Sequence, residues 1–355
     1  MAVDYKKELQ AIIDLLLEEK ASDIHFSVGT HPLIRVSGTL IPLVKKPVLT
    51  EADVDAFAKA LMRKDQYERL EKREEVDFSF ENTQAVRFRG NGFFQRGKKA
   101  VALRLIPNVI KTFEELNLPP ILESFTQRSQ GFFLCVGPVG QGKSTTLASM
   151  VNLINQNRSE HIVTIEDPIE YVYTEEKSLI DQREVGLDTL SFTSALNSAF
   201  RQDVDVILVG EMRNADTIST AVTAAETGHL VYSTLHTNDA SQTINRIIDS
   251  FPGDQQDQIR VQLSSSLIAI FSQRLIPHIT GGLVPAYELL INNTAVANLI
   301  RENRVHEIPS VIETGLEQGM IDMNRSLARL VQNGDITVEN AFTYSVNPKG
   351  LERLI

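Results

Sequence analysis

The sequence contains a single cysteine, Cys135, among 355 residues. One thiol is too few for a disulfide framework, for a four-cysteine zinc site, or for a zinc site of two cysteines and two histidines. Cys135 lies inside an apolar run, which predicts a small core residue rather than a reactive thiol. The low cysteine content also suits a reducing cytoplasm.

Long apolar runs are absent as well. No run approaches the roughly 18 residues that a membrane-spanning helix needs, and the best early run, residues 11–17, contains Asp14. The first eight residues lack the continuous apolar segment of a signal peptide. We therefore expect a cytoplasmic protein without direct membrane insertion.

Excess basic charge is also missing, since the net charge is −11. The first 110 residues carry 18 Lys and Arg against 16 Asp and Glu, and the remainder carries 17 against 30. Such an acidic body argues against broad nucleic-acid binding, which depends on phosphate neutralisation, and so against a DNA motor. The near-neutral first part could instead face the acidic part of a neighbouring subunit.

The hydrophobic pattern predicts an α/β protein of two domains. Before residue 108, helices at 3–19 and 50–62 accompany short strand-like runs, which is typical of an α+β domain. Residues 107–120 contain three prolines and a short helical signal at 112–116, so we place a linker at 109–119. Apolar strands then alternate with helices over 120–293, which predicts a parallel sheet buried on both faces. Residues 294–355 are predicted to form a helical C-terminal subdomain. The strands expected on the two sides of the linker are residues 23–28, 33–36, 39–44, 76–81, 86–94 and 100–106, and then 131–136, 161–165, 206–209 and 230–234.

The strongest motif is the segment Gly137–Ser144, which fits G-x-x-x-x-G-K-[ST] between a predicted strand and a predicted helix. In such a P-loop, backbone N–H groups and the helix N-terminus bind phosphates. Lys143 should reach the β- and γ-phosphates of ATP, and the hydroxyl of Ser144 should hold Mg²⁺. The predicted nucleotide-binding residues are Gly137, Pro138, Val139, Gly140, Gln141, Gly142, Lys143, Ser144 and Thr145.

Two acidic segments follow strands of the same predicted sheet. Glu211 ends the run 205–211 and could hold the Mg²⁺ hydration shell. The run 164–170 contains Glu166, Asp167 and Glu170, and a carboxylate there could orient or deprotonate the attacking water. An acid at a strand end is often merely solvated, so only their joint occurrence after a P-loop indicates catalysis.

The histidines and arginines are ambiguous by spacing alone. His229 and His236 flank the run 230–234, and their separation makes a shared metal ion improbable, which favours hydrogen-bonded structural histidines. Four arginines fall within eighteen residues, which fits either a solvated basic patch or arginine fingers supplied in trans, and spacing slightly favours the patch. These arginines are Arg87, Arg89, Arg96 and Arg104.

Taken together, the motifs resemble those of type IV pilus retraction ATPases, the PilT/PilU group of the secretion-ATPase superfamily. The resemblance covers essentially the whole chain. It is carried by the P-loop and by segments 21–25 (ASDIH), 164–170 (TIEDPIE), 182–186 (QREVG), 207–213 (ILVGEMR), 223–229 (TAAETGH), 233–237 (STLHT) and 298–302 (NLIRE).

The resemblance implies a PAS-like N-terminal domain, a RecA-like ATPase domain and a homohexameric ring that uses ATP and Mg²⁺. It assigns Glu166 as the catalytic acidic residue of an Asp box, Glu211 to an atypical Walker B motif, and His229 with His236 to a nucleotide-sensing His box. Arg89 and Arg104 match arginines that approach nucleotide in the ring. The implied work is pilin disassembly through an inner-membrane platform protein, at the inner face of the cytoplasmic membrane.

Several positions do not decide between the PilT and PilU branches of this group, and they keep alternative functions open. Val204 stands where the family usually has proline, and Ala295-Val-Ala297 replaces the Ala-Ile-Arg of retraction ATPases. Segments 305–308 and 347–351 look closer to the PilU branch, so an accessory ring that works with a paralogous retraction ATPase remains possible. A pilus-assembly or type II secretion ATPase is disfavoured, because those proteins carry a tetracysteine zinc insertion.

Overall fold

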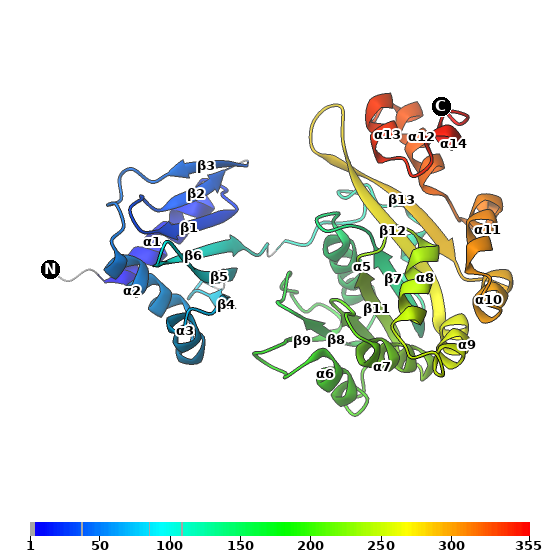
Figure 1. The fold of residues 1–355 in the computed structure, drawn as a ribbon, viewed down its shortest axis with the longest axis horizontal. Helices are drawn as coiled ribbons and strands as arrows, with labels where there is room; N and C mark the ends of the chain where they lie inside the picture. The colour runs from blue at the N-terminus through cyan, green and yellow to red at the C-terminus, as the bar shows by residue number, and fades with distance from the viewer. Residues whose placement is uncertain (1–3, 37, 85, 108) are drawn as a thin grey trace. The chain divides into compact units, whose positions relative to one another are not determined.

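The computed structural model describes residues 4–36, 38–84, 86–107 and 109–355, and the chain divides into two compact units (Figure 1). The N-terminal unit comprises the described residues before 108 together with 170–172, and the C-terminal unit comprises 109–169 and 173–355. None of the helices in these described ranges combines the length and apolar character needed to cross a bilayer.

The N-terminal unit is an antiparallel sheet of six strands with helices packed on one face. Its elements are α1 (Tyr5–Glu18), β1 (Asp23–Ser27), β2 (Leu33–Val36), β3 (Thr39–Pro42), α2 (Glu51–Leu61), α3 (Lys64–Glu71), β4 (Val76–Glu81), β5 (Arg87–Gln95) and β6 (Lys98–Leu105). The strand order is β3-β2-β1-β6-β5-β4. Thr50 caps α2, because its hydroxyl accepts a hydrogen bond from the backbone N–H of Asp53. Phe26 stacks on Phe57 of α2, which ties the sheet to this helix.

The C-terminal unit is built on a seven-stranded sheet of order β13-β12-β7-β11-β10-β8-β9. All neighbouring strands are parallel except β12 and β13, which form an antiparallel hairpin. The strands are β7 (Gly131–Val136), β8 (His161–Glu166), β9 (Leu179–Glu184), β10 (Val206–Val209), β11 (Leu230–Leu235), β12 (Leu267–Pro277) and β13 (Leu283–Ile291). The α/β fold class with a mainly parallel sheet is confirmed.

Helices cover both faces of this sheet (Figure 1). Phe132 and Leu134 of β7 belong to the core formed with α6 to α9, whereas Phe133 on the opposite face packs against Phe125 of α4. The helices are α4 (Leu122–Thr126), α5 (Lys143–Asn157), α6 (Phe192–Ala199), α7 (Ala215–Glu226), α8 (Ala240–Asp249), α9 (Gln256–Ser266), α10 (Thr294–Arg301), α11 (Ile308–Thr314), α12 (Met323–Asn333), α13 (Val338–Tyr344) and α14 (Pro348–Leu351), with 3₁₀ turns at Val305–Glu307 and Leu316–Gln318. Cys135 is fully buried in β7, and this burial raises the pKa of its thiol to about 12, as expected of a core residue.

The short helical signal at residues 112–116 corresponds to a single turn. The N–H of Leu116 donates to the carbonyl of Thr112, the N–H of Thr112 donates to Glu115 Oε2, and the N–H of Glu115 donates to the hydroxyl of Thr112. The chain leaves this turn at Asn117, whose φ of 51° is left-handed, and two prolines follow. A capping box therefore starts a turn that has no room to propagate.

Candidate active site

The P-loop joins the end of β7 to the start of α5. Gly137 has a φ of 142°, and a Cβ atom placed there would lie 2.4 Å from the carbonyl oxygen of Gln273, so no other residue fits. Gly142 has a φ of 76° and directly precedes α5, which begins at Lys143. The backbone N–H groups at this helix start therefore stand at the end of the loop, an arrangement that suits phosphate oxygens.

Lys143 is held by the loop that precedes it. Its Nζ donates to the carbonyl oxygens of Gly137 and Pro138 at 2.8 Å each, and its residue is only 7% exposed. The same Nζ lies 3.3 Å from Nδ1 of His236. Because an ammonium group only donates, Nδ1 of His236 accepts in this contact.

His236 continues this chain of contacts to Glu211. Its Nε2 lies 3.5 Å from Oε2 of Glu211, while the guanidinium of Arg213 pairs with Oε1 of the same carboxylate. Glu211 lies two residues after the end of β10, and His236 directly follows β11, which is the parallel neighbour of β10. Lys143, His236 and Glu211 thus come together at the carboxyl ends of three strands.

Glu166 ends β8 at the same edge of the sheet. Its residue is 8% exposed, and the hydroxyl of Thr164 donates to its Oε1 at 2.7 Å. The β8–β10 pairing places Ile165 beside Val209, and the N–H of Gly210 donates to the carbonyl of Ile165. A buried carboxylate that accepts a hydrogen bond from a hydroxyl at this edge of the sheet is a suitable base for water.

His229 lies at the other end of β11. Its Nδ1 donates to the carbonyl oxygen of Ala224 at 3.0 Å, and its ring meets Phe200 edge-on at a centroid distance of 5.6 Å. The six-residue strand between the histidines spans about 20 Å at roughly 3.3 Å per residue. Within one chain, the structure therefore brings His236 but not His229 to the P-loop.

Arg89 and Arg104 belong to the N-terminal unit, where they are direct cross-strand neighbours on β5 and β6. Arg104 donates through Nε to Oδ1 of Asp23 at 2.9 Å, and its side chain is 72% exposed. Arg89 is exposed as well. Both side chains are available to an anion from outside this unit.

Sequence reasoning missed Gln273, which lies in the middle of β12 and is 2% exposed. Its Nε2 donates to the carbonyl of Gln141 at 2.7 Å, and its Oε1 accepts from the hydroxyl of Thr146 at 2.6 Å. The N–H of Leu275 donates in turn to the side chain of Gln141. These bonds fasten the P-loop to β12. A polar pair, Ser272-Gln273, inside an apolar strand was the available signal.

Comparison with known proteins identifies the family. The family model for type II/IV secretion system proteins matches residues 4–317. This chain belongs to that family. Similar members include the type IV pilus retraction ATPase PilT of Pseudomonas aeruginosa, 43% identical over 334 residues that cover 94% of this chain and 97% of that protein. The twitching motility protein of Neisseria gonorrhoeae is 46% identical over 321 residues, covering 90% of this chain and 86% of that protein.

Solved structures agree with this family assignment. A crystal structure of the pilus retraction motor PilT with bound ADP matches with a TM-score of 0.90 and 49% identity, covering 96% of this chain and 98% of that one. The Legionella pneumophila ATPase DotB matches with a TM-score of 0.84, but at 24% identity this likeness concerns the fold alone. The present secretion-family member is a nucleotide-binding ATPase.

Proposed function

We propose that this secretion-family ATPase is a hexameric, Mg²⁺-dependent motor that powers type IV pilus retraction from the cytoplasmic side of the inner membrane. The observation that carries the catalytic part is the meeting of Lys143, His236 and Glu211 at one edge of the sheet, with Glu166 on a neighbouring strand. The retraction part is supported by the relatives named for retraction and twitching motility.

In this proposal, catalysis is positional and electrostatic. Lys143 and the backbone amides of the P-loop, from Gly137 to Thr145, bind the phosphates. Glu166 accepts a proton from the attacking water, and Thr164 holds the carboxylate in place for this step. When a γ-phosphate draws Lys143 away from the loop carbonyls, the contact between Lys143 and His236 changes, which makes His236 a sensor of nucleotide state.

The residues near the P-loop also suit a magnesium ion. Mg²⁺ prefers oxygen ligands and retains several waters. The hydroxyl of Ser144 and the carboxylate of Glu211 are such ligands. Ser144 lies in the first turn of α5, and Glu211 lies in the loop just after β10. Bound there, the ion would neutralise charge on the phosphates.

Within one chain, some of the expected site residues lie away from the sheet edge that carries the P-loop. Assembly into a ring would bring them to the nucleotide of a neighbouring copy. We assign Arg89 and Arg104 as arginines that reach the nucleotide of a neighbouring copy, and His229 as a sensor that acts across copies. Hydrolysis would then move the N-terminal unit against the ATPase unit and act on an inner-membrane platform protein. This transmission step rests on the family resemblance.

An accessory ring is the second candidate function. The chain is 38% identical to the Pseudomonas aeruginosa pilus ATPase PilU over 349 residues, which cover 98% of this chain. In α10, the retraction segment departs at Val296 and Ala297, while Ala295, Asn298 and Arg301 are exposed on the helix surface. Such a ring would act together with a paralogous retraction ATPase.

ATP turnover by the purified full-length protein tests the catalytic proposal. Lys143→Ala should reduce turnover by a factor of 100 or more, on the order of the losses seen when charge stabilisation is removed from an active site. Lys349→Ala changes an exposed lysine of α14 and should retain turnover. Near-normal turnover in Lys143→Ala would contradict the P-loop assignment, and negligible turnover in the unmodified protein would favour the accessory ring.

A further inference from the structure

Four charged residues occupy one row across the N-terminal sheet. The strand register pairs Arg35 with Asp23, Asp23 with Arg104, and Arg104 with Arg89. Side chains that are directly opposite in antiparallel strands project from the same face. Ile24, the next residue of β1, is fully buried in the core with α1 and α2, so the row lies on the face away from these helices.

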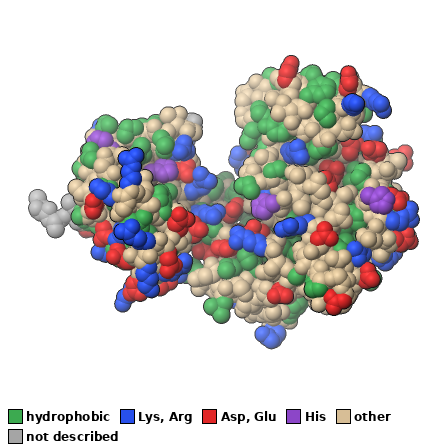
Figure 2. Space-filling model, in the orientation of Figure 1, with side chains coloured by type: hydrophobic (Ala, Val, Ile, Leu, Met, Phe, Trp, Pro, Cys, Tyr) green, Lys and Arg blue, Asp and Glu red, His purple; other side chains and the backbone are tan. Residues whose placement is uncertain are grey.

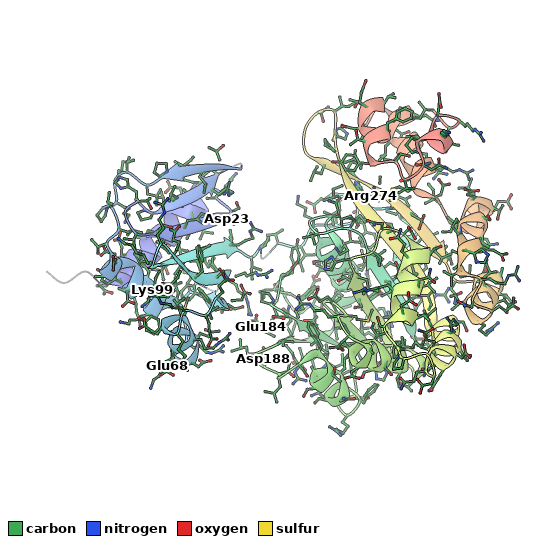
Figure 3. The ribbon with its side chains drawn as sticks, in the orientation of Figure 1. Asp23, Glu68, Lys99, Glu184, Asp188 and Arg274 are labelled. Atoms are coloured by element: carbon green, nitrogen blue, oxygen red, sulfur yellow. The ribbon has the colours of Figure 1, made fainter. Side chains whose placement is uncertain are left out.

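Asp23 is the one acid among these four residues. Figure 3 labels its position in the N-terminal unit. It is 6% exposed, and its carboxylate accepts a hydrogen bond from Nε of Arg104 at 2.9 Å while Nε of Arg35 lies 3.8 Å away. The hydroxyl of Ser22 donates to the second oxygen at 2.6 Å. Burial alone would raise the pKa of Asp23, but these hydrogen bonds from Ser22 and Arg104 hold it below its usual value, so the group is charged at neutral pH.

The contact with Asp23 uses only the inner nitrogen of Arg104. Among the described residues, none accepts a hydrogen bond from the two terminal nitrogens of Arg104, and the side chain is 72% exposed. Phosphate is bound most specifically by a pair of guanidinium nitrogens in one plane. A carboxylate at Nε therefore fixes the plane of the guanidinium and leaves its terminal pair open to a phosphate.

The charges in the row support the same arrangement. Three arginines and one aspartate leave the row positive, although Lys and Arg are interspersed with Asp and Glu over the visible face of the N-terminal unit (Figure 2). Without the carboxylate, three adjacent guanidinium groups would repel one another, and Arg104 would turn into solvent. Arg35 stands on the far side of Asp23, and its Nε lies farther from the carboxylate, at 3.8 Å, than Nε of Arg104 does.

We propose that Asp23 is a positioning residue for Arg104: it holds the guanidinium by Nε so that the terminal nitrogens meet the developing charge on the phosphates of a neighbouring subunit's ATP. This inference rests on the proposed function, in which Arg104 acts in trans. Asp23 itself touches no phosphate, and its contribution passes through Arg104.

A double-mutant cycle on ATP turnover by the assembled full-length ring tests this proposal. Asp23→Asn keeps the size and one acceptor oxygen but removes the charge, and it should lower kcat roughly ten- to a hundred-fold with little change in KM, as misplacement of a transition-state group does. Arg104→Ala should lower kcat at least as much. Asp23→Asn combined with Arg104→Ala should match Arg104→Ala alone within about twofold.

Two further variants serve as controls. Asp77→Asn changes an acid of β4 that accepts a hydrogen bond from Asn91 on the same sheet, outside the arginine row, and should leave kcat unchanged. Arg35→Gln should change kcat by less than about twofold, because Asp23 still holds the guanidinium of Arg104 by its hydrogen bond with Nε. Ring assembly and thermal unfolding are measured for each variant. If Asp23→Asn fails to assemble, the cycle is repeated with Asp23→Glu, which retains the charge and should keep more activity than Asp23→Ala.

The outcomes distinguish the positioning role of Asp23 from the in-trans role of Arg104. Loss of turnover in Arg104→Ala with additive loss in the double variant would overturn the positioning role of Asp23 while leaving the arginine in place. Normal turnover in Arg104→Ala would remove the in-trans role itself, and the inference with it. A loss in Arg35→Gln equal to that in Asp23→Asn would also overturn the inference, because the row would then act as an undivided basic surface.

Discussion

Nζ of Lys143 in the P-loop lies 3.3 Å from Nδ1 of His236, which directly follows β11, so the P-loop lysine lies against a histidine from the end of a different strand. The far side of the same imidazole faces Glu211. One ring thus links the loop that would bind phosphate with the carboxylate that would hold the metal ion. Any movement of Lys143 toward a phosphate must alter this link.

The first prediction concerns the hydrogen-bonding pattern of His236. Asparagine can accept and donate at its two side-chain atoms, whereas alanine can do neither. His236→Ala should therefore lower kcat of ATP hydrolysis at least about tenfold, while His236→Asn should lose less. Steady-state kinetics measures both, with His306→Ala as the control, because His306 is an exposed histidine with a side chain 77% accessible.

Equal losses in His236→Asn and His236→Ala would show that the imidazole matters by its size rather than by its contacts with Lys143 and Glu211.

The second prediction concerns Glu166 as the base. Glu166→Gln keeps the shape and the contact with Thr164 but cannot take a proton, so turnover should fall by about 10²- to 10⁴-fold while ATP still binds. Thr164→Val removes only the positioning hydroxyl and should cost turnover roughly tenfold. Binding of a fluorescent ATP analogue and turnover are measured in parallel. Joint loss of binding and turnover in Glu166→Gln would make this carboxylate structural.

The third prediction is a pH dependence that arises at Glu288. This residue of β13 accepts a hydrogen bond at 2.9 Å from the N–H of Ala240 at the start of α8, and burial raises its pKa to about 7. In the unfolded chain a glutamate titrates near 4.3. Between these values the folded state holds a proton that the unfolded state has lost, so stability falls as pH rises from about 4.3 to 7 and is level above.

Glu288→Gln should remove this dependence. Relative to the variant, the unmodified protein should lose about 1 to 3 kcal/mol of stability between pH 5 and pH 8. Urea unfolding followed through the transition of the C-terminal unit at both pH values measures the difference, with the exposed Glu339→Gln as control. A difference between the two proteins that does not change with pH would contradict the raised pKa.

The sequence was sufficient for the parts of the site that depend on local pattern. The P-loop could be found because glycine spacing, Lys143 and the flanking strand and helix are all local. Glu166 and Glu211 could be placed at one sheet edge because parallel strands end together. Their contacts with Thr164 and Arg213 needed the structure, since they depend on side-chain rotamers.

Residues that are joined through sheet register were beyond the sequence pattern. Gln273 reaches the P-loop only because β12 pairs with β7, although 127 positions separate Gln273 from Thr146. The row from Arg35 to Arg89 likewise depends on three strand pairings. Spacing alone left the histidines of β11 as a structural pair, whereas their contacts differ at the two ends of the strand. Pairing between distant segments is what a single sequence specifies least.

The number of surface pili on cells of the native host tests whether this ATPase powers pilus retraction. A deletion strain is complemented with the unmodified protein, with Lys143→Ala or with Lys349→Ala, and pili are counted by electron microscopy alongside twitching. If the protein is an ATP-driven retraction motor, the deletion strain and Lys143→Ala should show excess, non-retracting pili and no twitching, and the other two strains should recover. Cells without pili in both the deletion and Lys143→Ala would contradict retraction and identify an assembly ATPase.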